Sequence, residues 1–156
     1  MIVALFLGHA IYKQKFQQSG ESKSKQMAAS NSPKAIPSGF TSEERDVLKS
    51  PPQNAPQADI DKHFALASKL SKESDTLDIA NCRSNPLVLR IGLNKNLKIV
   101  NNENIDHRLI FDEDHQYKIS KNNTTTVKTD FGRGPGLYGY VCEGVGLTGF
   151  ILVTTP

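Results

Sequence analysis

Two cysteines, Cys82 and Cys142, carry the most informative chemistry in this sequence, and about 60 residues separate them. In an oxidising compartment such a pair predicts a disulfide, whereas in the cytosol it would be free or bound to a metal ion. The sequence contains no Gly-x-Ser-x-Gly motif, no glycine-rich phosphate loop and no His-Glu-x-x-His motif. We therefore expect a protein that is not an enzyme.

The segment that must position these cysteines has the residue alternation of β-strands. From Leu77 onward, apolar residues recur at every second position and polar turns separate the runs. The residues that alternate or share a face along the expected strands are Leu87, Leu89 and Ile91; Leu97, Ile99 and Asn101; His107, Leu109 and Phe111; Tyr117 and Ile119; and Tyr138, Tyr140 and Cys142. The His107 ring is expected to point inward at the end of the sandwich. About seven short strands with close turns predict an all-β, Greek-key sandwich. No helix long enough for a βαβ crossover interrupts them, which argues against a parallel sheet.

Two short helices are predicted ahead of the strands. The segment from Thr41 to Glu44 matches a capping box, so we expect a helix over about residues 42–49. A second helix is expected over about residues 59–73, packed on the sandwich. Its predicted apolar face consists of Ile60, Phe64, Ala67 and Leu70.

Composition divides the chain into four parts: an apolar run (1–12), a polar stretch (13–57), the helical lead-in (58–75) and the β domain (76–156). The polar stretch buries too little apolar surface to offset its ordering entropy, so we interpret it as a disordered tether. The apolar run is shorter than a full membrane span and has no basic leader. It is interpreted as a membrane anchor or a signal remnant, with a buried core segment as the alternative.

The charge of the chain gives little reason to propose nucleic acid as a partner. There are 19 basic and 16 acidic residues, which give a net charge of +3, and the basic residues form no single stripe. The oligomeric state is left open.

Several segments of the β domain resemble plastocyanin and other cupredoxins. The asparagine-rich run from Val100 to His107 is similar to the turn and strand that carry the first copper-ligand histidine of that family. The segment from Gly134 to Cys142, with its Tyr-x-Tyr-x-Cys pattern, resembles the strand that carries the ligand cysteine. The resemblance implies a cupredoxin-like fold, copper as the cofactor, and His107 and Cys142 as metal ligands.

The sequence departs from the family where the remaining ligands should stand. Cupredoxins have a histidine, and usually a methionine, soon after the ligand cysteine, but residues 143–149 contain neither. Val145 and Leu147 stand in that region, and neither side chain can bind a metal. A type 1 copper site needs two histidines and one cysteine. Cys82, in the segment that resembles the first strand connection of cupredoxins, is the best replacement.

Three alternatives therefore remain for these residues. In the first, Cys82, His107 and Cys142 bind Cu(I), or zinc with a fourth ligand from Glu143 or His115. In the second, Cys82 and Cys142 form a disulfide and His107 is a structural histidine. In the third, the two cysteines are inert thiols.

The resemblance, together with the cysteine pair, leads to two expected functions. The first is a membrane-tethered protein, facing the extracytoplasmic side, that binds copper for electron transfer or copper handling, with a redox or copper-donor protein as its partner. The second is a metal-free structural or binding module.

Tyr138 is expected to form a tyrosine corner and Tyr140 to lie in the core, while His9 and His63 have no expected role.

Overall fold

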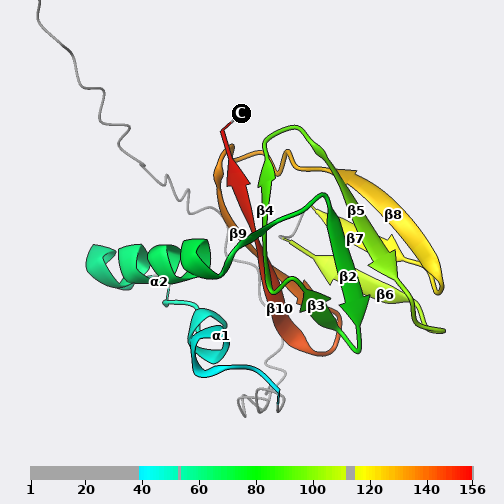
Figure 1. Cartoon of the computed structure of the whole chain (residues 1–156), viewed down its shortest axis with the longest axis horizontal. Coiled ribbons are helices and arrows are strands. Elements are labelled where there is room, and N and C mark those ends of the chain that lie inside the picture. Colours follow the sequence, from blue (N-terminus) through cyan, green and yellow to red (C-terminus); the bar gives the residue numbers. More distant parts are fainter. Residues whose placement is uncertain (1–38, 53, 112–114, 156) are drawn as a thin grey trace, which may run out of the picture. The chain divides into compact units, whose positions relative to one another are not determined.

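The structure, a computed structural model, describes residues 39–52, 54–111 and 115–155 (Figure 1). The predicted anchor and most of the predicted tether lie outside these residues. Among the residues described, no helix combines the length and the apolar character needed to cross a membrane.

The described part of the chain has two helices followed by ten strands. The helices are α1 (Ser42–Val47) and α2 (Gln57–Leu70). The strands are β1 (Lys72–Glu73), β2 (Thr76–Ala80), β3 (Arg83–Asn85), β4 (Val88–Gly92), β5 (Asn96–Asn101), β6 (His107–Ile110), β7 (Gln116–Ile119), β8 (Asn123–Lys128), β9 (Gly136–Cys142) and β10 (Gly146–Thr154). Helix α1 falls within the stretch that composition assigns to a tether.

The strands form two sheets, which confirms the predicted β-sandwich (Figure 1). One sheet has the order β1-β4-β10-β9-β6-β7 and the other the order β3-β2-β5-β8. The pairing is mixed, because β4 runs parallel to β1 and β10, and β2 runs parallel to β5. Neither sheet is parallel throughout, as expected, but the sequence did not predict these parallel pairs. No crossover helix is needed, because the chain passes through the opposite sheet between parallel neighbours.

The alternation of residues produces the core between the sheets. Strand β5 buries Leu97, Ile99 and Asn101, while its exposed positions include Lys98. The buried cluster contains residues from both sheets and includes Cys82 and Cys142. Burial of this apolar surface is the main stabilising contribution, at about 25 cal/mol per Å².

Strand β4 is buried on both faces, which its predicted single apolar stripe did not anticipate. Leu89 and Ile91 belong to the core between the sheets, but Val88 belongs to a second cluster. Leu87, which lies just before β4, also belongs to the second cluster, so the prediction that it shares a face with Leu89 and Ile91 is wrong. That cluster also contains Val47 of α1 and is completed by residues of α2 and β10. The helices thus cover the outer face of this sheet.

Both helices start close to where the sequence predicts. The capping box is present, because the Thr41 side chain accepts the Glu44 N–H and Glu44 accepts the Thr41 N–H. The predicted apolar face of α2 is wrong in part, since Ile60 and Phe64 are 40% and 45% exposed.

The face of α2 that contacts the rest of the domain is a neighbouring stripe at the same helical spacing. Leu66, Ala67 and Leu70 belong to the second cluster, and His63 lies edge-on to Phe150. This stripe also follows the i, i+3, i+4, i+7 rule, so periodicity alone does not choose between the two faces. Contact with Val47 favours the stripe that contains His63, since His63 Nε2 lies 2.7 Å from the Val47 carbonyl oxygen.

Candidate metal centre

Cys82 lies at the tip of a tight hairpin between β2 and β3. Asn81 and Cys82 form the two-residue turn, with φ angles of 52° and 53°. Two positive φ angles are typical of the hairpin turn whose twist matches the strands it joins. Asparagine adopts this backbone readily, but cysteine seldom does. The turn directs the Cys82 side chain inward, where the residue is buried among the core residues.

His107 opens β6 and faces the core, as predicted. It pairs with Ile119 of β7, and burial alternates along the strand, with His107 and Leu109 buried and Arg108 exposed. The residue is 7% exposed. The imidazole therefore lies at the end of the sandwich, inside its surface.

Cys142 is the last residue of β9 and lies opposite Leu109 of β6. Tyr138, Tyr140 and Cys142 alternate on the buried face of the strand, as the sequence predicts. The Cys142 N–H donates to the hydroxyl oxygen of Thr148, at 3.0 Å. This bond satisfies the backbone donor of the cysteine at the point where the strand ends.

The three predicted site residues meet at one end of the sandwich. Cys82 and Cys142 form a disulfide, with their Cα atoms 5.6 Å apart. The Nδ1 atom of His107 lies 3.5 Å from the Cys82 sulfur and 3.7 Å from the Cys142 sulfur. One potential ligand atom from each of the three residues lies within 4.8 Å of the other two. The structure thus contains the disulfide, and it also places the imidazole against both sulfurs.

Glu103 orients the histidine ring, and the sequence analysis did not identify it. Its Oε2 atom lies 2.6 Å from His107 Nε2 and also accepts the Asn81 N–H at 2.6 Å. A carboxylate accepts hydrogen bonds, so the ring donates from Nε2 to Glu103, and in the neutral ring the lone pair lies on Nδ1, the nitrogen that faces the sulfurs. Carboxylate partners of this kind commonly orient histidine ligands of metals.

Asn101 holds the loop that carries Glu103. It is fully buried, and its side-chain amide donates to the carbonyl oxygen of Ile105 at 2.7 Å. The same amide nitrogen lies 3.2 Å from the carbonyl oxygens of Ile119 and Ser120. Its side-chain oxygen accepts the Glu103 N–H at 2.9 Å. The side chain of the asparagine at the end of β5 therefore fixes the loop that carries Glu103, a role that the sequence did not predict.

The expected fourth ligands lie outside the group. Glu143 is exposed and forms a two-bond ion pair with Arg108, with distances of 2.5 and 3.0 Å. The Arg108 guanidinium lowers the pKa of the Glu143 carboxyl. The ring of His115 lies edge-on to Phe131, at 5.9 Å between centroids. Neither side chain joins the group formed by the cysteines and His107.

The loop that follows Cys142 is a tight turn. The Val145 N–H donates to the Cys142 carbonyl oxygen at 3.0 Å, and Gly144 and Gly146 have φ angles of 81° and 102°. Val145 is 41% exposed, whereas Leu147 packs against the second cluster. The loop turns back into β10 without supplying a donor side chain to the sulfurs.

Both tyrosines of β9 have structural roles, as predicted. The Tyr138 hydroxyl donates to the Gly134 carbonyl oxygen at 2.5 Å, which forms the tyrosine corner. Tyr140 is fully buried, with its ring 5.0 Å from that of Phe111. Burial raises the pKa of Tyr140, so this hydroxyl stays protonated at neutral pH.

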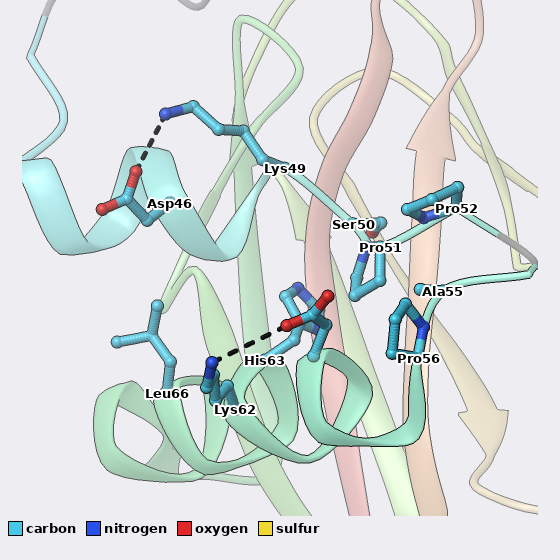
Figure 2. Close-up of a pocket in the computed structure, with 11 residues that line it drawn as sticks. Asp46, Lys49, Ser50, Pro51, Pro52, Ala55, Pro56, Lys62, His63 and Leu66 are labelled. Carbon is cyan, nitrogen blue, oxygen red and sulfur yellow. Dashed lines mark hydrogen bonds and ion pairs between the residues drawn. The ribbon is translucent and has the colours of Figure 1, made fainter.

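A surface hollow between α1, the connecting segment and α2 offers no comparable chemistry. Figure 2 shows its lining of prolines, Ala55, Leu66 and paired polar side chains. Lys49 contacts Asp46 at 2.9 Å, Lys62 contacts Asp59 at 3.7 Å, and His63 is bonded to the Val47 carbonyl. His63 thus has a packing role that the sequence analysis did not assign.

The donor set decides which metal chemistry the residues could support. Two thiolates and one imidazole suit Cu(I), which accepts soft ligands at low coordination number. Zinc requires a fourth protein ligand or water, and Glu103 already serves His107 and Asn81. The set lacks the second histidine of a type 1 copper site. The residues present therefore fit Cu(I) once the disulfide is reduced, and they do not fit a complete type 1 centre.

Comparisons with known proteins gave solved structures only. No protein-family model and no curated protein matches the chain. A reduced Cu(I) form of an amicyanin variant matches with 17% identity and a TM-score of 0.43, over 56% of this chain and 89% of that one. A purple cupredoxin from Nitrosopumilus maritimus matches with 14% identity and a TM-score of 0.42, over 51% and 98%.

A copper-containing nitrite reductase from Thermus scotoductus also matches, with 18% identity and a TM-score of 0.41. The match covers 52% of this chain but only 22% of the reductase, so the matched part spans about a fifth of that protein's length.

Proposed function

We propose that this is a cupredoxin-like domain that handles copper, binding one Cu(I) ion when the Cys82–Cys142 disulfide is reduced. The observation that supports the proposal is the convergence of two sulfurs and His107 Nδ1, with a potential ligand atom of each residue within 4.8 Å of the others. The two thiolates and the Nδ1 lone pair would hold the ion. Glu103 would keep the ring in the orientation that presents Nδ1.

Copper storage or delivery fits this donor set better than fast electron transfer. Two thiolates favour Cu(I) over Cu(II), so a bound ion would resist the change of oxidation state that electron transfer requires. Nothing in the proposal calls for a substrate, and the domain would act as a carrier and not as an enzyme. A copper-donor or redox protein would be its partner.

The proposed setting is the extracytoplasmic side of a membrane. A disulfide is typical of proteins outside the reducing cytosol. The apolar residues 1–12 would supply the membrane tether. Fractionation of cells that express the full chain would test this proposal. Recovery of the protein in the cytosolic fraction would overturn it.

Copper binding can be tested directly on purified protein. The protein is reduced with a phosphine under nitrogen, freed of reductant and titrated with Cu(I) against a chromophoric Cu(I) chelator. We expect one ion per chain. Cys82→Ser, Cys142→Ser and His107→Ala should each weaken binding at least tenfold, while His115→Ala, at the histidine outside the group, should not. Wild-type protein that takes up no Cu(I) when reduced and folded would overturn the proposal.

The disulfide itself favours a second candidate, a metal-free binding or structural module. In that case Cys82–Cys142 is a permanent staple between the β2–β3 turn and the end of β9. The protein would have no reactive thiols as purified, and no gain of Cu(I) binding on reduction. The titration above distinguishes the two candidates, because only the first predicts uptake after reduction.

A further inference from the structure

We infer that disulfide formation and metal binding are two exclusive states of one site, exchanged by thiol–disulfide exchange with a dithiol partner; this inference rests on the proposed copper site. Both states use the same two sulfur atoms, those of Cys82 and Cys142. A metal ligand must be a thiolate, and a disulfide sulfur is not one. Formation of the disulfide therefore removes two of the three donors.

The two cysteines stay in register when the bond between them opens, because backbone bonds hold each one separately. Cys82 is fixed by the β2–β3 hairpin, in which Ala80 pairs with Arg83 on either side of the turn. Cys142 is fixed by its pairing with Leu109 and by the bond from its N–H to Thr148. The reduced sulfurs would therefore remain at the separation set by Cα atoms 5.6 Å apart.

Glu103 ties the Cys82 turn to the histidine independently of the disulfide. One carboxylate oxygen accepts both the Asn81 N–H and the His107 Nε2–H, each at 2.6 Å. The residue next to Cys82 and the imidazole are thus held by the same atom. We assign Glu103 as a positioning residue that keeps Cys82 and Nδ1 facing each other in both states.

The partner dithiol reduces the Cys82–Cys142 disulfide in two steps. A thiolate of the partner dithiol attacks the Cys82 sulfur, which belongs to the more exposed cysteine (7% against 1% for Cys142). A sulfur–sulfur bond forms between the partner and Cys82, the Cys82–Cys142 bond breaks, and its electron pair stays on Cys142 as a thiolate. The second partner thiolate then attacks the partner's own sulfur in the mixed disulfide, and the bond to Cys82 breaks. Cys82 is released as a thiolate, and the partner leaves as an internal disulfide. Two electrons pass to the protein and the dithiol loses two protons to solvent.

Metal binding should shift this redox equilibrium. Cu(I) binds only the reduced state, so it stabilises that state by mass action. Free Cu(I) at one hundred times its Kd gives about a hundredfold shift, which corresponds to about 60 mV in the midpoint potential of a two-electron couple. His107→Ala keeps both cysteines and should show a smaller shift at the same Cu(I) concentration.

The experiment follows copper and thiols in the same samples of the full chain. Phosphine-reduced protein is loaded with Cu(I), freed of reductant and treated anaerobically with excess oxidised glutathione in the presence of a Cu(I) chelator. We expect two thiols to disappear for each copper ion released, with the Cys82–Cys142 bond identified by mass spectrometry. Reduction should then restore Cu(I) uptake.

The outcomes separate the two proposals. If the folded, reduced protein takes up no Cu(I), the proposed function itself fails. If it takes up Cu(I) but retains the ion after the disulfide has formed, or if the thiols do not form that disulfide, the switch is overturned while the copper site stands.

The role of Glu103 has its own control. Glu103→Ala removes the oxygen acceptor and should weaken Cu(I) binding by about tenfold to a hundredfold. Glu103→Gln keeps an oxygen at this position and should weaken it less, and Glu73→Gln, at an exposed strand carboxylate, should not change it. The nitrogen-15 shifts of His107 should show Nε2–H in the wild type and a mixture of tautomers in Glu103→Ala. An unchanged tautomer together with unchanged affinity would overturn the assignment.

Discussion

The Cα atoms of Cys82 and Cys142 lie 5.6 Å apart across a sequence separation of 60 residues, and the disulfide between them joins the β2–β3 turn to the end of β9. The β2–β3 turn belongs to one sheet and β9 to the other. The bond therefore links the two layers of the sandwich at the end where His107 lies.

Reduction of this disulfide should lower the free energy of unfolding by about 4 kcal/mol, because a closed loop of this length restricts the unfolded chain. The prediction is tested by urea unfolding with and without a phosphine reductant, in the absence of metal. The double variant Cys82→Ala/Cys142→Ala should not respond to the reductant, since the sequence contains no other cysteine. Equal stability of oxidised and reduced wild-type protein would contradict the prediction.

Cu(I) should restore part of this stability to the reduced protein. A ligand that binds only the folded state adds about 2.7 kcal/mol when its free concentration is one hundred times its Kd. The measurement is thermal unfolding of reduced protein at a buffered free Cu(I) concentration. The oxidised protein serves as the control and should not respond, since its sulfurs are joined to each other.

Thr148→Val should destabilise the protein by about 1–3 kcal/mol, because the buried Cys142 N–H loses its acceptor. The Thr148 hydroxyl accepts this N–H at 3.0 Å and donates to the Gly146 carbonyl oxygen, also at 3.0 Å. Thr148→Ser keeps the hydroxyl and should retain most of the stability. Urea unfolding of the oxidised forms compares the variants, and equal losses for valine and serine would count against the hydrogen bond.

Gly149→Ala should destabilise the domain by about 1–3 kcal/mol through overpacking. A Cβ atom there would lie 2.7 Å from the Leu87 carbonyl oxygen and 2.7 Å from the Tyr140 hydroxyl. The Leu87 carbonyl cannot move freely, since it accepts the Phe150 N–H.

Gly136→Ala is the matched control for this substitution. The nearest atom to its added Cβ is 3.8 Å away, on Tyr138. We expect a change within about 0.5 kcal/mol in thermal or urea unfolding. A similar loss at both positions would show that crowding at Gly149 is not the cause.

Asp106 should make stability depend on pH in the acid range. The Lys118 ammonium, 2.7 Å away, and the Lys121 N–H lower the pKa of this carboxyl. A lowered folded-state pKa contributes stability above the unfolded pKa, near 4, and that contribution is lost as the pH falls through the folded pKa. The stability gap between wild type and Asp106→Asn should therefore close as the pH falls below about 4. Urea unfolding over pH 2–6 measures the gap; one that stays constant would contradict this account.

Alternation along the chain was enough to predict the sandwich and the inward side chains of its central strands. Period-two burial of Leu97 and Ile99, and of Tyr138 and Cys142, follows from the two faces of a strand. The capping box likewise predicted the start of α1, because its hydrogen bonds are local to four residues. These features depend on neighbours in sequence, which a single chain displays.

Helical periodicity did not identify the buried face of α2, because two stripes of residues have the same helical spacing. The stripes of α2 through Phe64 and through His63 both have helical spacing, and contact with α1 and the sheet selected the second. The parallel pairing of β4 with β10 was also missed, since it requires two segments about 60 residues apart to become neighbours.

The sequence by itself determined which donors exist: two cysteines, an inward-facing histidine, and a loop after Cys142 without histidine or methionine. Only the tertiary structure decided that the sulfurs are joined, that Nδ1 faces them, and that Glu103 holds both His107 and the Cys82 turn. The reason is physical: residue types and periodicity specify which side of a strand a group occupies, whereas disulfide formation and ring orientation depend on ångström-scale distances between segments far apart in the chain.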